Sequence, residues 1–264
     1  MAISESEKGL FTSGRMDMPS PLKVGVYVDG FNLYYGGRSI CGKGKAGWKW
    51  LDLRKLSHRL IEQRSGWPAA TELKIDYCTA RVSGFEDPQL PIDQDAYIRA
   101  LVSANSVDVI EFGFFNHSVS LAPLATFGKR GKPKVFNPQL PVLVQDSSSS
   151  DIHEAKFVVS FAKWEEKGTD VNLASYLLID TFSNEIDAAI VISNDSDLKF
   201  PIQEVRKHIP VGTVNPSSKR TAGALRNSTF NQTENHWSYQ LQQEDFFESQ
   251  FPVNVGKFRK PQNW

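Results

Sequence analysis

The chain has 264 residues, of which 40% are hydrophobic and 23% are charged. These values are typical of a globular protein that buries a core. Because 30 basic and 30 acidic residues cancel, the net charge gives no evidence for or against a nucleic-acid partner. No apolar run approaches the roughly 20 residues that span a bilayer, so the sequence predicts no contact with a membrane.

Two features of the sequence indicate the compartment. The two cysteines, Cys41 and Cys78, form neither a CxxC pair nor a zinc-binding spacing, which is typical of a reducing environment. Residues 1–20 lack an apolar core, so they predict a disordered tail and not a signal peptide. We therefore expect a cytoplasmic protein.

The first part of the chain alternates strands with helices. Apolar runs predict strands over residues 22–29, 73–82 and 107–114. Apolar residues at helical spacing predict helices over residues 51–63 and 93–104, which lie between these strands. Such alternation implies an α/β fold with a parallel sheet and right-handed crossovers.

Two segments interrupt the alternation. Residues 36–50 are rich in Gly, Lys and Trp and predict a mobile loop. Residues 115–144 hold short β-rich stretches around a basic loop and predict an inserted hairpin. Phe127 and Phe136 flank four cations, a mixture that suits contact with an RNA backbone, although an ordinary exposed hairpin explains it equally well. The cations are Lys129, Arg130, Lys132 and Lys134.

The alternation resumes further along the chain. Residues 152–166 mix apolar and charged side chains without a clear period. A helix is predicted over residues 171–182, with Thr169 or Asp170 as its N-cap. Five apolar residues, 188–192, then predict a strand that is buried on both faces of a parallel sheet.

A helix and a strand complete the predicted domain, which covers residues 21–216. Apolar residues at helical spacing follow residue 197, and Asp197 is placed to cap that helix. Residues 211–214 predict the fifth strand. Residues 217–264 predict an extension whose aromatic end packs on the domain or on a partner subunit, so a homodimer is one arrangement that fits.

Acidic side chains follow the carboxyl ends of two predicted strands. Asp29 ends the first strand, and Asp195 and Asp197 follow the buried strand 188–192. Because ligands of open α/β sheets bind beyond the strand C-termini, these carboxylates should meet at one edge, with Asp170 entering from a helix N-terminus. Taken singly, an Asp-Gly turn explains Asp29 and helix capping explains Asp170.

The chemistry of this edge points to a metal ion. Carboxylates that crowd together are unfavourable unless a cation neutralises them or one is protonated. Oxygen ligands without His or Cys select a hard ion, so we expect Mg²⁺ or Mn²⁺, whose bound water could hydrolyse a phosphodiester. Other polar side chains at this edge are candidates for binding substrate: Asn32, Ser193, Ser196 and Lys167.

Three blocks of the sequence resemble the signature blocks of the NYN-domain family of PIN-like nucleases, in the family's order. They are Val26-Tyr-Val-Asp-Gly-Phe-Asn-Leu-Tyr-Tyr35, Lys167-Gly-Thr-Asp-Val-Asn-Leu-Ala174 and Ile192-Ser-Asn-Asp-Ser-Asp-Leu198. The likeness covers roughly residues 22–216. It implies a three-layer αβα fold with a central, mostly parallel sheet and a divalent-metal-dependent endoribonuclease.

The resemblance also implies roles for the acids. The family's first-strand Asp falls on Asp29, and its second block places an Asp at Asp170. The third block gives Asp195 and Asp197, so these four residues would be catalytic and would bind the metal. Asn194 departs from the family pattern, because many relatives have Gly there.

Other interpretations stay open beside the nuclease. A haloacid-dehalogenase-like phosphatase would need a second Asp two residues after Asp29, and that position is Phe31. A PIN-like domain can also keep the fold and lose activity, and then serves as an RNA-binding or scaffold protein. A nucleotide-binding α/β protein would need a glycine-rich phosphate loop, for which residues 29–32 are too acidic.

Overall fold

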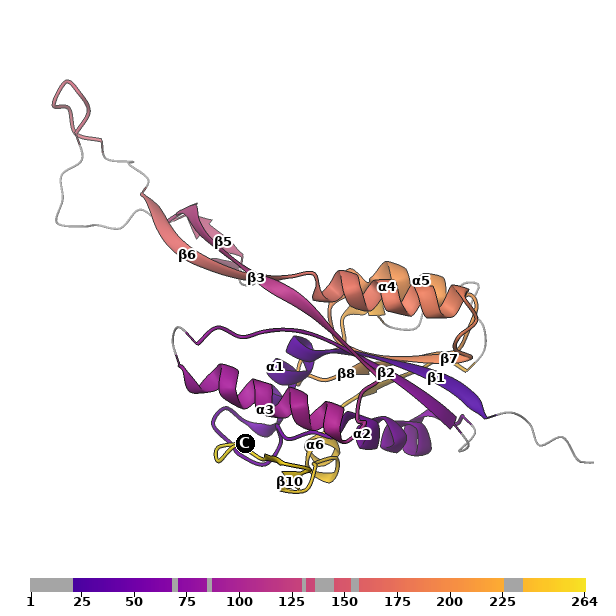
Figure 1. Ribbon diagram of the computed structural model, residues 1–264. Helices are drawn as coiled ribbons and strands as arrows, with labels where there is room; N and C mark the ends of the chain where they lie inside the picture. Colours follow the sequence, from indigo (N-terminus) through magenta and orange to yellow (C-terminus); the bar gives the residue numbers. More distant parts are fainter. Residues whose placement is uncertain are drawn as a thin grey trace, which may run out of the picture.

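The protein is an α/β protein whose mostly parallel sheet lies between two layers of helices (Figure 1). The expected three-layer αβα architecture is therefore confirmed. The predicted tail, residues 1–20, lies outside the described residues. The computed structural model describes residues 21–67, 71–84, 87–129, 132–135, 145–152, 157–225 and 235–264.

The central sheet has seven strands in the order β6-β3-β2-β1-β7-β8-β9. They are β1 (Leu22–Asp29), β2 (Thr71–Ala80), β3 (Val109–Pro123), β6 (Val158–Lys167), β7 (Ala188–Ile192), β8 (Val211–Asn215) and β9 (Trp237–Gln240). Every neighbouring pair is parallel except β3 and β6. In chain order, β2, β3 and β6 are added on one side of β1. The later strands β7, β8 and β9 are added on its other side. The boundary between β1 and β7 is thus a topological switch point, where α/β proteins commonly bind ligands.

Helices cover both faces of the sheet (Figure 1). One face carries α4 (Thr169–Phe182) and α5 (Lys199–Val205). The other carries α1 (Gly30–Cys41), α2 (Leu53–Leu60), α3 (Gln89–Ser103) and α6 (Gln243–Glu248). Short helical turns are η1 (Ile61–Ser65), η3 (Ser196–Leu198) and η4 (Gly223–Leu225). Within the described ranges, no helix is long and apolar enough to cross a membrane.

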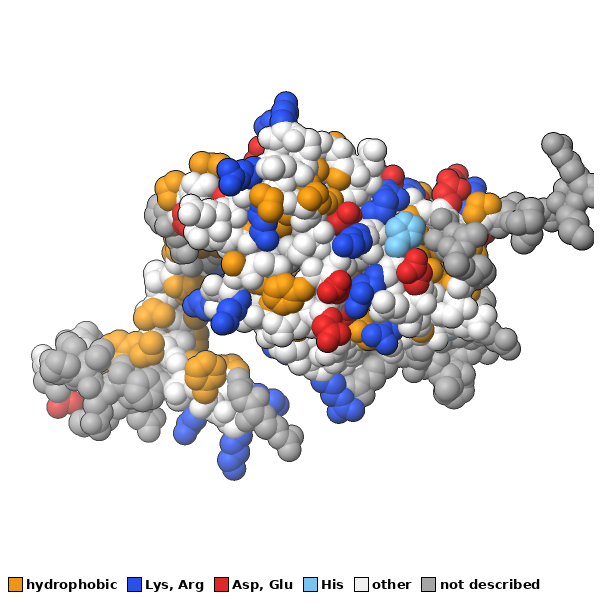
Figure 2. Space-filling model, turned by 90° about the horizontal axis from the view of Figure 1, so that it is seen from below, with side chains coloured by type: hydrophobic (Ala, Val, Ile, Leu, Met, Phe, Trp, Pro, Cys, Tyr) orange, Lys and Arg blue, Asp and Glu red, His pale blue; other side chains and the backbone are white. Residues whose placement is uncertain are grey.

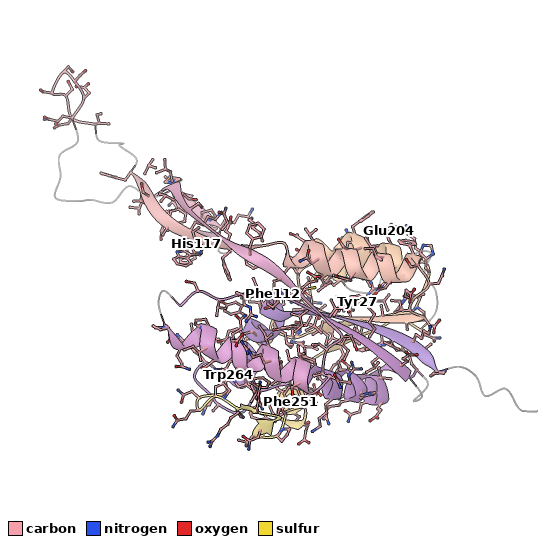
Figure 3. The ribbon with its side chains drawn as sticks, in the orientation of Figure 1. Tyr27, Phe112, His117, Glu204, Phe251 and Trp264 are labelled. Carbon is pink, nitrogen blue, oxygen red and sulfur yellow. The ribbon has the colours of Figure 1, made fainter. Side chains whose placement is uncertain are left out.

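Alternation along β1 divides the interior into two cores. Val24, Val26 and Val28 are fully buried in the core on the side of α1, α2, α3 and α6. Tyr27 points to the opposite face and packs in the core that includes Leu173 of α4 (Figure 3). A strand that is buried on both faces needs a continuous apolar run, which is why β1 and β7 were predictable from sequence.

Helix α1 includes residues 36–41 of the segment predicted to be a mobile loop, so that prediction was wrong for these residues. The glycines that favoured a loop serve close packing instead. A Cβ at Gly36 would collide with the backbone carbonyl of Pro216, and one at Gly37 would lie 2.7 Å from the Phe246 ring. The helix therefore approaches its neighbours where only glycine fits.

The predicted insertion, residues 115–144, belongs to a longer arm. Strand β3 continues beyond the body and pairs with β6 in an antiparallel ladder (Figure 1). A small antiparallel hairpin of β4 (Ala125–Phe127) and β5 (Pro133–Val135) follows β3 along the chain. Arm side chains are largely exposed, and Figure 2 shows hydrophobic and cationic side chains close together on it. In the arm, residues 130–131, 136–144 and 153–156 are outside the described ranges.

The described residues after 216, namely 217–225 and 235–264, pack against the rest of the chain. Strand β9 extends the central sheet by pairing with β8, and a two-stranded ladder of β10 (Asn254–Val255) and β11 (Phe258–Arg259) follows α6. Trp50 is fully buried and contacts the rings of Phe251 and Trp264. Figure 3 shows both of these rings on the side of the sheet that α3 covers.

Candidate functional site

Asp29 lies at the end of β1, buried at the switch point of the sheet. Its Oδ1 accepts a hydrogen bond of 2.9 Å from the backbone N of Asn32, so Asp29 caps α1. Its Oδ2 accepts a hydrogen bond of 2.9 Å from Ser193 Oγ. Burial raises the pKa of Asp29, while these hydrogen bonds oppose the rise. The structure thus joins the two predicted strand ends through the Asp29 carboxylate.

The loop after β7 is held by its own polar side chains. Ser193 Oγ accepts a hydrogen bond of 3.1 Å from the backbone N of Asp195. Asp195 Oδ1 accepts one of 2.9 Å from the backbone N of Asp197, so Asp195 caps η3. The helix predicted after residue 197 is α5, whose N-cap is Leu198, so the prediction that Asp197 caps it was wrong. Asp197 and Ser196 are both exposed.

Asn194 connects this loop to two other segments. Its backbone N donates a hydrogen bond of 3.2 Å to Asn32 Oδ1. Its side-chain Oδ1 accepts a hydrogen bond of 2.8 Å from the backbone N of Ala222. An Asn at this position therefore binds the segment before η4 to the acidic edge, a contact that a Gly could not make. The side chain of Asn32 orients this loop, whereas the capping of α1 falls to Asp29.

Asp170 lies in the first turn of α4, but it is not the N-cap. Gly168 is the N-cap, with a φ of 96° that glycine adopts readily, so the predictions of Thr169 or Asp170 were wrong. The pKa of Asp170 is raised to about 6, first by burial and then by the charges of Asp29, Asp195, Glu166 and Asp197, in that order. The four predicted acids thus interact electrostatically, together with Glu166.

Glu166 was not identified from the sequence. It is near the end of β6, and its Oε1 accepts a hydrogen bond of 3.1 Å from the backbone N of Thr169. Glu166 comes close to Asp170 because of the position at which β6 ends. Since β6 has no regular apolar pattern, the sequence does not predict that position. The adjacent Lys167 is exposed, and its Nζ lies 3.4 Å from Glu165 Oε2, so a carboxylate already pairs with it.

The number of ligands that the acidic edge brings together decides which kind of metal site it suits. Within the described ranges, no three Asp, Glu, His or Cys side chains lie close enough to hold one ion together. Mg²⁺, however, commonly binds through one or two carboxylates and keeps several waters. Asp29 and Asp195 fit that mode, because both are carboxylates at one edge and the charge of Asp195 raises the pKa of Asp29. The residues therefore fit a hydrated ion and not a closed protein cage.

The predicted cations of the arm lie apart from the acidic edge. Lys129 and Lys132 are exposed in the turn between β4 and β5, on the arm that projects from the body (Figure 1). Arg130 lies outside the described residues. These side chains do not complete the acidic site within the chain as described, so any role in binding would be at a distance from it.

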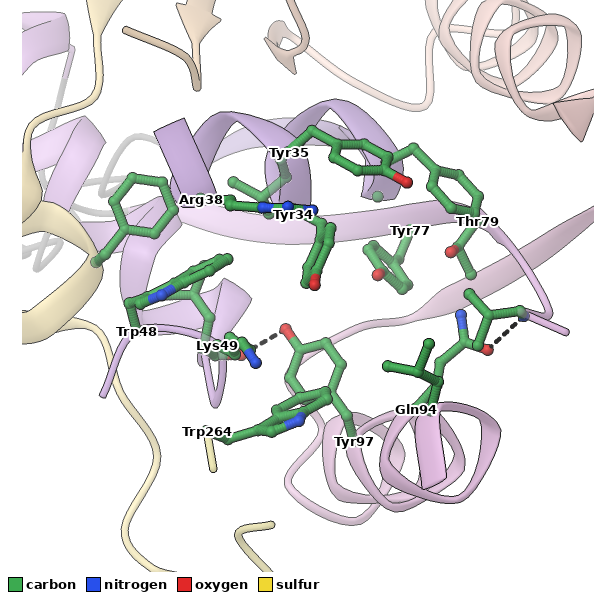
Figure 4. Close-up of a pocket in the computed structure, with 17 residues that line it drawn as sticks. Tyr34, Tyr35, Arg38, Trp48, Lys49, Tyr77, Thr79, Gln94, Tyr97 and Trp264 are labelled. Atoms are coloured by element: carbon green, nitrogen blue, oxygen red, sulfur yellow. Dashed lines mark hydrogen bonds between the residues drawn. The ribbon is translucent and has the colours of Figure 1, made fainter. Parts of the chain in front are cut away.

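A pocket of about 340 Å³ adjoins the acidic edge on the side of α1 and α3 (Figure 4). Gly30 and Phe31, which directly follow Asp29, are part of its lining. We call it the aromatic pocket, and its other principal lining residues are Tyr34, Arg38, Trp48, Lys49, Tyr77, Tyr97 and Trp264. No sequence pattern indicates this pocket, because the rings come from separate segments of the chain.

No family model matches the chain. A curated relative, 6-hydroxy-3-succinoylpyridine 3-monooxygenase HspA of Pseudomonas putida (strain DSM 28022 / S16), is 28% identical over 220 residues. The match covers 77% of this chain and 62% of the relative, so the chain spans less than two thirds of the relative's length. A solved structure, the protein of unknown function VPA0982 from Vibrio parahaemolyticus RIMD 2210633, has a TM-score of 0.44 at 12% identity. That comparison covers 88% of this chain and 99% of the other.

Proposed function

We propose that the protein hydrolyses phosphodiester bonds of RNA with Mg²⁺ or Mn²⁺ bound at its acidic edge. The observation that carries this proposal is the environment of Asp170, whose pKa is raised to about 6 by burial and by four neighbouring carboxylates. A cation at this edge would offset that repulsion. The resemblance to NYN domains supports the same function.

The residues of the acidic edge would have different roles in this reaction. Asp29 and Asp195 would hold the ion, and Ser193 keeps the Asp29 carboxylate in place by donating to its Oδ2. A bound metal supplies an activated water and offsets negative charge on the phosphate. Asp170 would face the bound ion as a carboxylate, because a cation beside it would lower the pKa that burial and the neighbouring acids raise.

Cleavage of labelled single-stranded and structured RNAs tests this proposal. The wild type should cut in Mn²⁺ or Mg²⁺ and not in EDTA. Asp195→Asn should reduce the rate by roughly 100-fold, because the edge loses a carboxylate that holds the ion. Asp187→Asn is the matched control, since Asp187 is an exposed acid that precedes β7 at the opposite end of the strand. Cleavage that persists in EDTA or in Asp195→Asn would contradict the proposal.

A binding measurement separates this function from the inactive alternative. Mn²⁺ should raise the melting temperature of the wild type more than that of Asp195→Asn, because an ion that binds the folded state stabilises it. RNA that is bound but not cut, with no effect of Mn²⁺, would favour an RNA-binding or scaffold protein.

A second candidate is oxidation of a small aromatic ring. The relative that is 28% identical is named as a monooxygenase of 6-hydroxy-3-succinoylpyridine, and the aromatic pocket has room for one such ring. Consumption of that compound in the presence of oxygen and a supplied electron donor would support this function. This oxidation should be unchanged in Asp195→Asn and should be lost when residues that line the aromatic pocket are replaced.

A further inference from the structure

Aromatic rings from distant parts of the chain converge in the aromatic pocket (Figure 4). Tyr34 of α1 lies 5.6 Å from the Trp48 ring, with the two planes tilted by 39°. Tyr97 of α3 lies 5.5 Å from the ring of Trp264, near the carboxyl end of the printed sequence. These faces and edges suit stacking against a flat ring, and a volume of about 340 Å³ is at the small end for ligand pockets.

Two cations, Arg38 and Lys49, line the same pocket. Lys49 Nζ lies 5.9 Å from the Trp48 ring centroid and 5.6 Å from that of Trp264. Neither Lys49 nor Arg38 forms an ion pair with a carboxylate of the described residues. Burial lowers the pKa of Lys49, the charge of Asp93 opposes this, and the charge of Arg38 lowers the pKa further. An anionic ligand would neutralise these half-buried charges.

The pocket and the acidic edge share a boundary. Gly30 lies against Tyr77, since a Cβ at Gly30 would come within 2.8 Å of the Tyr77 hydroxyl oxygen. Gly30 and Phe31, which line the pocket, directly follow Asp29 in the chain. A ring held in the pocket would therefore lie beside the residues proposed to hold the metal.

From this geometry we propose that the aromatic pocket binds a planar aromatic ring that carries an anionic group. The ring would stack among Trp48, Tyr97 and Trp264, and the anion would face Lys49 and Arg38. Two sources supply this chemistry: a nucleotide of the RNA proposed above as substrate, and a free aromatic acid. The proposal that a nucleotide of RNA binds here depends on the proposed function. The proposal that the pocket binds an aromatic anion does not depend on it.

Calorimetric titration of the full chain in EDTA tests the site without metal or turnover. The ligands are adenosine 5′-monophosphate and pyridine-3-carboxylate, each compared with its uncharged counterpart, adenosine or pyridine-3-carboxamide. At least one anion should bind, and its uncharged counterpart should bind about tenfold more weakly. Lys49→Gln should weaken binding of the anion by a similar factor. Lys43→Gln, which changes an exposed lysine outside the pocket, should not.

The outcomes distinguish the two sources and the two proposals. Binding of the nucleotide identifies an RNA subsite, and binding of the pyridine acid identifies a site for free aromatic acids. If neither anion binds, or if binding is unchanged in the double variant Lys49→Gln/Arg38→Gln, the site is overturned. Because the titration contains no metal, a failed cleavage assay would leave this result standing.

Discussion

The side chain of Asp76 has an unusual environment for a carboxylate. It lies on β2 in the interior, with 1% of its surface exposed, and neither carboxylate oxygen has a hydrogen-bond partner among the described residues. Its pKa is raised to about 7, chiefly by burial; the charge of Lys74 opposes the rise, and the charges of other acids add to it. Lys74 instead pairs with Asp180, at 2.6 Å, and Tyr27 donates to the same Asp180 oxygen. Asp76 is thus a buried acid that favours its neutral form.

Replacing Asp76 with Asn should therefore change stability in a pH-dependent way. Because the pKa of Asp76 rises from 3.8 to about 7 on folding, its ionisation destabilises the wild type increasingly between about pH 4 and pH 7. We expect Asp76→Asn to increase the free energy of unfolding at pH 8, by at most about 4 kcal/mol. At pH 4 the change should be near zero. Urea denaturation at pH 4 and pH 8 measures this change in the free energy of unfolding. If Asp76→Asn were less stable than the wild type at pH 8, the interpretation of Asp76 as an unpaired carboxylate would be wrong.

The composition of the acidic edge was predictable, but the partners of its residues were not. Apolar runs place Asp29 and Asp195 at strand ends, and parallel strands bring those ends to one edge. Which side chain caps which helix depends on the φ and ψ angles of the loop, which apolar patterns do not encode. Asp197 therefore does not cap α5, and Asp195 instead caps the preceding turn η3. Glu166 was missed because it approaches Asp170 only through the end of β6.

Among the secondary-structure elements, buried strands were predictable and edge strands were not. Strands β1 and β7 are buried on both faces, so their sequences are continuously apolar. Strand β6 is at one edge of the sheet, with mostly exposed or half-buried side chains, and strand β9 is a short strand at the other. Neither β6 nor β9 has a buried face that would require apolar residues at every second position. Pairing with the neighbouring strand therefore decides the conformation of these two segments.

The arm allows a test of whether its cations contact RNA. Three exposed lysines lie in or beside the β4–β5 hairpin: Lys129, Lys132 and Lys134. Replacing all three with Ala should weaken RNA binding and make it less sensitive to salt, because each lost phosphate contact reduces the slope of log K against log salt by about 0.7. Affinity measured across a salt series gives this slope.

A control with the same change in net charge shows whether location matters. Exposed lysines elsewhere on the molecule are available: Lys55, Lys207 and Lys257. Their replacement with Ala should leave the salt slope nearly unchanged. Equal slopes for the two triple variants would mean that the arm acts only through the overall charge, and the hairpin would then be an ordinary exposed one.

The carboxyl-terminal residues make the molecule one packed unit. Strand β9 continues the sheet that begins with β1, and the segment after α6 covers Trp50. Trp50 Nε1 donates a hydrogen bond of 2.8 Å to the carbonyl oxygen of Pro252, and Trp50 O accepts one from the backbone N of Phe251. The aromatic residues that indicated a docking tail thus find partners within the same chain. Aromatic content alone could not distinguish this packing from a subunit interface.

Two phenylalanines near this segment provide a matched test of that packing. Phe251 is 7% exposed and contacts the Trp50 ring, whereas Phe247 on α6 is 41% exposed. Phe251→Ala should lower the free energy of unfolding by about 3–5 kcal/mol, because it opens a cavity beside Trp50. Phe247→Ala should cost about 1 kcal/mol or less. Urea denaturation at two protein concentrations measures both. If the Phe251→Ala loss appears only at high concentration, this ring stabilises a contact between subunits and not the fold of one chain.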